Sequence, residues 1–402
     1  MENIIDLIGG GIVGSIVVLL VKNSDGVINF FNKAIKCIKW SKRMKEKIDL
    51  RYFYPLSHIK SILSKNEYAS DSEFIKYSLA LSDGWYSNST KWLKVKVDGE
   101  IKNIEIPYAE VIDYLKDSEP SIRVSRLCEQ YVMPDSIRNL TDRNLTDFLH
   151  RKPNTYNGET LRIKSLSKIS GNLYDCELQS ATYFDQIRTN LTLDLPLLGQ
   201  EECTLRELDL DKNKIIKPFS ESIMANSIGV SAIWYTPDVH RKNKNGIRFF
   251  LKPRKSSTGV FYNALGTISG VVAPPKEGCF HSSFLEDYVK QELLREFYEE
   301  TYNKNSDKDI RSYVPENKIE ITLLAFVREL TRGGKPQFMF LIKTPYIDNS
   351  TMKELFNGSE EFSDNIVSTL TSYDLSPETY VNYLYAIRYI QRNQYLEYIN
   401  LD

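Results

Sequence analysis

An acidic stretch in the C-terminal half of the chain carries residues whose types and spacing could do chemistry. Residues 291–301 contain no proline or glycine, and their leucine, glutamate and arginine favour a helix. On a helix, the carboxylates fall on one arc and the apolar side chains on another: Glu292, Glu296, Glu299 and Glu300 against Leu293, Leu294 and Phe297. Like charges at this spacing repel one another, and a divalent cation would relieve the repulsion. The alternative is an acidic helix face that simply lies in water.

The order of residues in this helix resembles the core of the Nudix box, R-E-apolar-x-E-E, over residues 295–300. In that family the arginine orients glutamates that hold magnesium or manganese against a diphosphate. The resemblance implies Arg295, Glu296, Glu299 and Glu300 as catalytic residues if the site is active. It likewise implies Glu296, Glu299 and Glu300 as ligands of Mg²⁺ if a metal is bound. Three outer positions depart from the pattern, at His281, Asp287 and Tyr302. These departures put hydrolysis in doubt and favour a domain that holds phosphates.

Length and composition bound the class of protein. The chain has 402 residues, enough for two or three domains, and 42% hydrophobic with 26% charged residues is typical of folded protein. The net charge of −1 gives no sign of affinity for a DNA or RNA polymer. The 5 cysteines are widely spaced without a C-x-x-C pair, which argues against a disulfide framework and a structural zinc site.

The N-terminus predicts a single membrane-spanning helix at residues 1–21, because residues 7–21 are uncharged and mostly apolar. A signal peptide would begin with basic residues, whereas this segment carries Glu2 and Asp6. A buried soluble helix is the other alternative, although the apolar surface would run right round it. Gly10 and Gly14 have the G-x-x-x-G spacing that lets helices associate in lipid.

Residues 22–50 predict a basic amphipathic segment beside the membrane, in which lysines alternate with aromatic and aliphatic residues. The positive-inside rule then places the main body in the cytoplasm. A solvated linker helix is the alternative.

The remainder predicts an α/β fold. Residues 51–156 form a mixed α+β linker or small domain, with a hairpin over 92–106 and helices at 108–116 and 136–149. Residues 157–402 form a Nudix-like α/β/α sandwich, with strands at 161–166, 173–179, 191–195, 232–236, 247–252, 265–272, 319–327 and 337–342. Ser376 and Pro377 predict the start of a closing helix that runs to about residue 395.

Three further motifs extend the resemblance to one bacterial group, the SMODS-associated Nudix proteins, which are transmembrane effectors of CBASS antiphage systems. The motifs are Tyr183-Phe184-Asp185, Thr189-Asn190-Leu191 and Ala225-Asn226-Ser227-Ile228-Gly229-Val230-Ser231. The resemblance implies a sensor that binds a cyclic oligonucleotide made after infection. It also implies self-association in the lipid bilayer and disruption of the inner membrane.

A cyclic oligonucleotide presents phosphodiesters and flat bases, so its site needs cations, amides and aromatic faces. Residues 248–270 supply these groups. The predicted ligand-binding residues are Arg248, Lys252, Arg254, Phe261, Tyr262, Asn263 and Thr267. A solvated strand face with core aromatic residues is the alternative for each of them.

Three functions stay open from the sequence. The first is the membrane-anchored sensor and effector described above. The second is a membrane-tethered, Mg²⁺-dependent Nudix hydrolase of a nucleoside diphosphate derivative. The third is a membrane scaffold that recruits partner proteins. The changed positions at His281 and Tyr302, together with the membrane architecture, favour the first.

Overall fold

The computed structural model describes Phe74 and Ile75, residues 85–356 with gaps at 88, 98–99, 116–119, 128, 239–245, 254–263 and 277–281, and residues 375–392. All of them belong to the second of two compact units, Tyr52–Asp402. The predicted membrane helix at 1–21 and the basic segment at 22–50 lie outside the described residues. Within the part of the chain that is described, no helix is long and apolar enough to cross a membrane.

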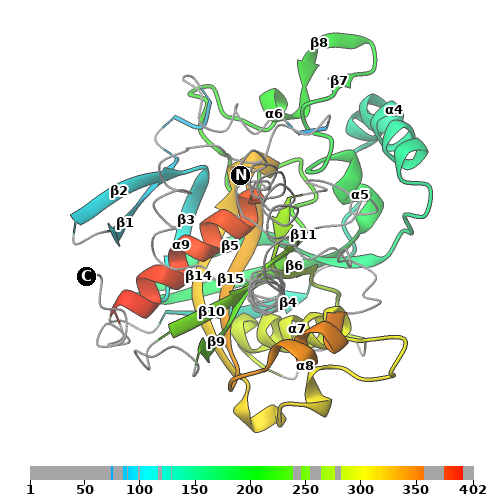
Figure 1. Ribbon diagram of the computed structural model, residues 1–402. Coiled ribbons are helices and arrows are strands. Elements are labelled where there is room, and N and C mark those ends of the chain that lie inside the picture. Colours follow the sequence, from blue (N-terminus) through cyan, green and yellow to red (C-terminus); the bar gives the residue numbers. More distant parts are fainter. Residues whose placement is uncertain are drawn as a thin grey trace, which may run out of the picture. The chain divides into compact units, whose positions relative to one another are not determined.

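A mixed sheet forms the centre of the described unit (Figure 1). Its strands, in spatial order, are β10 (Gly246–Phe250), β9 (Gly229–Asp238), β15 (Lys335–Lys343), β14 (Glu320–Glu329) and β3 (Tyr108–Asp113), with β13 (Ile268–Val271) also paired to β9. Strands β9 and β15 are parallel, and the other pairs are antiparallel. The prediction of a mixed α/β protein is therefore confirmed.

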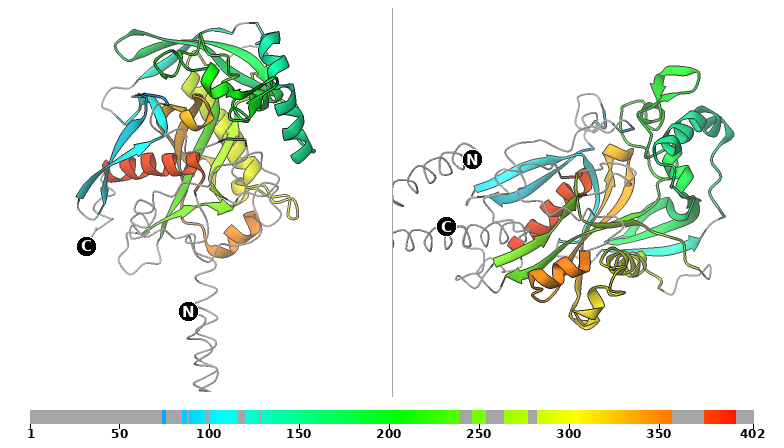
Figure 2. Two further views of the ribbon diagram at one scale, coloured as in Figure 1. Left: turned by 90° about the horizontal axis from the view of Figure 1, so that it is seen from above. Right: turned by 45° about the vertical axis from the view of Figure 1, so that its right-hand side comes forward.

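One helix packs on each face of this sheet, and the alternation of β9 explains why (Figures 1 and 2). Val230, Ala232 and Trp234 share a core with α7 (Leu285–Glu300). Ile233 and Tyr235, which point to the other face, share a second core with α9 (Pro377–Arg392). Helix α7 buries a stripe at every fourth residue: Leu285, Val289, Leu293 and Phe297. The predicted acidic helix is confirmed.

Smaller sheets and helices surround this centre. Strands β4 (Ser121–Leu127), β6 (Leu173–Thr182) and β5 (Glu159–Ser170) form a three-stranded sheet, and β1 (Lys91–Val97) with β2 (Glu100–Ile106) forms the predicted hairpin. Two further pairs are β7 (Pro196–Leu197) with β8 (Gln200–Thr204) and β11 (Lys252–Pro253) with β12 (Leu265–Gly266). The remaining helices are α4 (Asp135–Arg151), α5 (Tyr183–Arg188), α6 (Leu205–Leu208), α8 (Asn349–Phe356) and the 3₁₀ turns η2 (Ile310–Ser312), η3 (Glu316–Lys318) and η4 (Leu330–Arg332).

Two sequence predictions about local structure are wrong. Residues 108–113 of the predicted helix at 108–116 form β3, because this segment pairs with β14, more than 200 residues away in the chain. Residues 191–195 are turns and not a strand. There the side-chain hydroxyl of Thr192 donates to the carbonyl of Ile187, and such local bonds compete with strand pairing. Strand β3 thus joins part of the 51–156 region to the central sheet.

The start of α9 agrees with its predicted cap. The Ser376 hydroxyl accepts a hydrogen bond from the backbone N–H of Thr379 at 3.2 Å, and Pro377 occupies the first helical position. The helix is described as far as Arg392, and the last residues of the predicted closing helix lie outside the described part.

The packing of α7 generates a test. Phe297 is fully buried, with its ring 5.1 Å from that of Trp234. Replacing it by alanine leaves a cavity, so Phe297→Ala should lower the free energy of unfolding by about 3–5 kcal/mol. The matched control is Lys290→Ala on the exposed face of the same helix, which should change it by less than about 0.5 kcal/mol. Urea unfolding followed by circular dichroism measures both, and equal losses would show that α7 is not seated as described.

Candidate functional site

Arg295 is the centre of the acidic edge of α7. Its Nη2 lies 3.1 Å from Glu292 Oε2 and 2.5 Å from Glu296 Oε1, and its Nη1 donates to both carboxylate oxygens of Glu299 at 2.9 Å. The helical spacing makes this arrangement possible, because residues three and four apart lie on neighbouring turns. Burial lowers the pKa of the guanidinium, but Glu296 and the other carboxylates outweigh that effect and raise it above its ordinary value. Arg295 therefore stays charged and binds three carboxylates.

The backbone of β13 and the loop after it meets the other side of the same edge. The N–H of Ser269 donates to Glu300 Oε1 at 3.0 Å, and the N–H of Ala273 donates to Glu292 Oε2 at 3.3 Å. Between them, a Cβ on Gly270 would clash with the carboxylate end of Glu296, so a larger residue there would force the Glu296 side chain to move. Helix α7 is thus joined to β13 through its carboxylates as well as through its apolar stripe.

These contacts decide how well the carboxylates fit a metal ion. Among the described residues, no group of three His, Cys, Asp or Glu side chains is placed to hold one. Glu296 and Glu299 face Arg295, whereas Glu300 is buried and faces the Ser269 amide. The repulsion that favoured a bound cation in the sequence is relieved by Arg295 instead. Whether Glu296, Glu299 and Glu300 bind a metal stays a prediction, and in this arrangement Arg295 and the Ser269 amide are their partners.

Most of the predicted ligand-binding side chains lie outside the described part of the chain: Arg248, Lys252, Arg254, Phe261, Tyr262 and Asn263. The backbone of Arg248 lies in β10 and that of Lys252 in β11. Thr267 is described and buried, and its hydroxyl donates to the carbonyl oxygen of Ala232. In this structure Thr267 therefore supports the sheet.

The sequence motifs around residues 189 and 226 form a buried polar clamp. Asn190 Oδ1 accepts from the backbone N–H of Asn226 at 2.9 Å, and Asn190 Nδ2 donates to the carbonyl oxygen of Arg332 at 2.8 Å. Thr189 Oγ1 accepts from the N–H of Ala225 at 3.1 Å. Asn226 has a φ of 46°, a left-handed conformation that asparagine tolerates well. The clamp holds the segment before β9 against the turn between β14 and β15.

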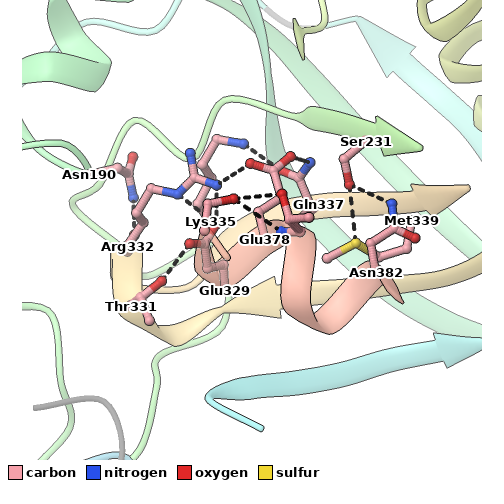
Figure 3. Close-up of polar contacts among 12 residues, drawn as sticks. Asn190, Ser231, Glu329, Thr331, Arg332, Lys335, Gln337, Met339, Glu378 and Asn382 are labelled. Atoms are coloured by element: carbon pink, nitrogen blue, oxygen red, sulfur yellow. Dashed lines mark hydrogen bonds and ion pairs between the residues drawn. The ribbon is translucent and has the colours of Figure 1, made fainter. Parts of the chain in front are cut away.

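A network of buried charges lies next to this clamp (Figure 3). Arg332 Nε donates to Glu329 Oε2 at 2.6 Å, and Arg332 Nη2 lies 3.1 Å from Glu378 Oε2. Gln337 Nε2 donates to Glu378 Oε1 and Lys335 Nζ donates to Gln337 Oε1, both at 2.7 Å. Glu378 lies in the first turn of α9, where the helix dipole favours a negative charge. The network ties α9 to the β14–β15 turn.

The third motif, which includes the start of β9, contacts this charge network. A Cβ on Gly229 would clash with the ends of the Gln337 and Lys335 side chains, so a larger residue there would displace these two members of the network. Two residues on, Ser231 Oγ accepts from Asn382 Nδ2 of α9 at 3.0 Å (Figure 3). The motif residues that carried the sequence resemblance therefore hold this corner of the fold together.

The sequence predictions did not include Glu329, Arg332, Lys335 or Glu378. The available signal was a set of charged residues beside Gly333 and Gly334, at the ends of two apolar strands. That signal shows a turn, but it does not show which charges become buried and paired.

In the described part of the chain, Lys335 is the charged residue of the network whose charge is not paired with a carboxylate. It is 1% exposed, and Gln337 Oε1 is the acceptor for its ammonium group, while Arg332 binds the neighbouring carboxylates. Burial, assisted by Arg332 and opposed by Glu378 and Glu329, lowers the pKa of Lys335 to about 7. The amine is consequently poised to lose its proton near neutral pH.

No protein-family model and no curated protein matches the chain. The functional argument therefore stands on these side chains and their geometry.

The burial of Lys335 predicts in which direction the free energy of unfolding changes with pH. Unfolded lysine keeps its proton up to about pH 10.4, whereas folded Lys335 loses it near neutral pH. Because the unfolded state then binds more protons, the free energy of unfolding should rise from about pH 7 to 9, by up to about 1.4 kcal/mol per pH unit. Lys335→Met should remove most of that rise.

The control for this prediction is Lys318→Met, at an exposed position, which should keep the pH dependence of the wild type. Urea unfolding at each pH gives the slopes. A Lys335→Met variant whose slope equals that of the wild type would contradict the assignment.

Proposed function

We propose that this chain is a membrane-anchored effector of bacterial antiphage defence, with a Nudix-like domain that senses a cyclic oligonucleotide. In this proposal the N-terminal helix holds the chain in the inner membrane, the main body lies in the cytoplasm, and ligand binding leads to self-association that disrupts the bilayer. The placement of the Arg-Glu-Phe-Tyr-Glu-Glu sequence on a helix against one face of a mixed sheet, with α9 on the other face, supports a Nudix-like sandwich.

The observation that carries the proposal is the binding of α7 carboxylates by Arg295. A hydrolase would present these glutamates to metal ions and a diphosphate. Here Glu292, Glu296 and Glu299 are bound by one guanidinium, and Glu300 accepts a backbone amide. Glutamates that are engaged in this way within the fold suit a domain that holds a ligand and leaves it whole.

The buried clamp and charge network add a second support. Binding groups on loops and strand ends work best when a rigid scaffold positions them. The segment before β9, the β14–β15 turn and the start of α9 are joined by hydrogen bonds and ion pairs through Asn190, Arg332 and Glu378. Strand β9 starts at this corner and pairs with β10, on which Arg248 lies.

The experiment uses the full chain in lipid nanodiscs. It is incubated with cyclic dinucleotides, cyclic trinucleotides and linear dinucleotides, with and without Mg²⁺, and the melting temperature and the intact ligand are measured in the same samples. The proposal predicts that one cyclic species raises the melting temperature and stays whole, because a ligand that binds the folded state stabilises it. The variant Glu299→Gln, altered at an exposed carboxylate, should respond as the wild type does.

Other results would overturn the proposal. Mg²⁺-dependent loss of a nucleotide that disappears with Glu299→Gln would make the chain a Nudix hydrolase. No response to any nucleotide would remove the sensor and favour the scaffold that recruits partner proteins.

A further inference from the structure

Arg328, near the end of β14, has a buried guanidinium without a carboxylate partner. The residue is 7% exposed. Its Nε donates to the carbonyl oxygen of Gly334 at 3.1 Å and its Nη1 to that of Lys217 at 2.6 Å, while its Nη2 has no acceptor. Among the described residues no carboxylate lies within ion-pair distance of it. The positive charge of Arg328 is therefore buried away from water, and its hydrogen-bond acceptors are two neutral carbonyl oxygens.

Other buried arginines of the same region show how the fold usually balances such a charge. Arg206 binds both carboxylate oxygens of Asp194, at 2.6 and 2.7 Å, and Arg332 binds Glu329 and Glu378. Leaving a buried guanidinium without such a partner costs several kcal/mol. Burial lowers the pKa of Arg328 to about 10, against the opposing charge of Asp209. Arg162 is also buried, and its acceptors in the described part of the chain are neutral as well, namely the carbonyl oxygens of Ala225 and Met224 and the side chain of Gln179. Each nitrogen of Arg162 has an acceptor, and Arg328 differs because its Nη2 has none among the described residues.

The groups around Arg328 are those that bind phosphate. The guanidinium carbon of Arg328 lies 4.1 Å from the centre of the Phe219 ring. Lys217, which lies two residues before Phe219, donates its Nζ to the carbonyl oxygen of Leu208. The carboxylate whose charge acts on Arg328 is that of Asp209, which accepts hydrogen bonds from the Ser222 hydroxyl and the Ile223 N–H. A planar guanidinium with spare donors, held flat on an aromatic ring, is suited to a phosphate oxygen pair.

Residues 211–218 cover the guanidinium. The Lys217 carbonyl accepts from Nη1, and the Ile216 side chain packs so closely on Gly334 that a Cβ there would lie 2.1 Å from Ile216 Cδ1. The outer side of this loop is exposed and basic, with Lys212 and Lys214. Its acid, Asp211, caps the loop's own N–H groups at residues 213 and 215.

The cover is also held from outside the loop. The Ser87 N–H donates to the carbonyl oxygen of Lys214 at 3.1 Å, and Lys214 Nζ lies 4.9 Å from the centre of the Trp85 ring. Ile216 packs against Tyr86, Leu210 and Leu330. These contacts must break when the loop lifts.

We infer that Arg328, Lys217 and Phe219 form an anion site for a phosphate group, which is reached when residues 211–218 lift away from Gly334. The carbonyl of Lys217 leaves Nη1 in that movement, and the phosphate oxygens take its place and that of the missing acceptor on Nη2. The inference deepens the proposed function, on which it rests for the nature of the natural ligand, a phosphodiester. The site itself needs only a phosphate oxygen pair.

The test compares inorganic phosphate with chloride at equal ionic strength, on the full chain in nanodiscs of zwitterionic lipid. Phosphate should raise the melting temperature of the wild type in a saturable way. Arg328→Met should lose that rise and melt in chloride no lower than the wild type, because the uncompensated charge is gone. Lys217→Gln should weaken the apparent affinity for phosphate several-fold.

The matched control is Arg311→Met, which removes an exposed arginine and should keep the whole phosphate response. Coincident melting curves in phosphate and chloride for the wild type would overturn the inference, and so would a phosphate response that survives Arg328→Met. If Arg328→Met does not fold, Lys217→Gln decides the question, since an unchanged affinity would refute the site.

Two further measurements distinguish a lipid phosphate from a soluble one. They also test this site independently of the proposed function. Nanodiscs that contain phosphatidylglycerol test a lipid headgroup, and the cyclic oligonucleotide of the earlier panel tests a soluble ligand. A phosphate response without any cyclic oligonucleotide response leaves the site standing and removes the sensor. A cyclic oligonucleotide response that survives Arg328→Met leaves the sensor standing and overturns the assignment of this site to the ligand's phosphodiester.

Discussion

The cost of taking charges out of water is the constraint on which this structure depends. Arg206 with Asp194 and Arg332 with Glu329 and Glu378 are ion pairs enclosed by protein. Distant segments are joined by the Arg332–Glu378 pair and by the hydrogen bonds of Arg206 to the carbonyl oxygens of Leu330 and Thr331. Breaking one partner of such a pair leaves an uncompensated charge and costs about 3–5 kcal/mol. The positions of the β14–β15 turn, the segment before β9 and the first turn of α9 are therefore fixed together.

The same constraint acts on α7 in a milder form. Arg295 is only partly buried, yet it binds glutamates one, three and four residues away, so part of the negative charge of the acidic face is balanced within the helix. In an active Nudix site the arginine would orient glutamates that also hold a metal ion. The proposal of a domain that holds its ligand therefore depends on Glu292, Glu296 and Glu299 staying bound to Arg295 in place of a metal. Among the described residues, the charged groups of Lys335 and Arg328 donate to neutral acceptors and not to carboxylates, and both residues lie close to the β14–β15 turn.

Local patterns were enough to predict several elements. The stripe of Leu285, Val289, Leu293 and Phe297 specifies α7, and the alternation on either side of residues 98–99 specifies the β1–β2 hairpin. Pairing between distant segments was not predictable, which is why β3 was taken for a helix. The charged residues at the candidate site show the same limit. Their spacing places Arg295 beside its glutamates, but the pairing of Glu378 with Arg332 depends on how α9 packs.

Titration of Mn²⁺ followed by its electron paramagnetic resonance signal tests the central claim, that Arg295 satisfies the α7 carboxylates, most directly. The account predicts that the full-length wild type leaves the signal of hydrated Mn²⁺ unchanged at micromolar metal. It also predicts that Arg295→Gln gains affinity for Mn²⁺, because the freed glutamates again repel one another. Saturable micromolar binding by the wild type that is lost with Glu296→Gln would contradict the account and restore a metal-dependent enzyme.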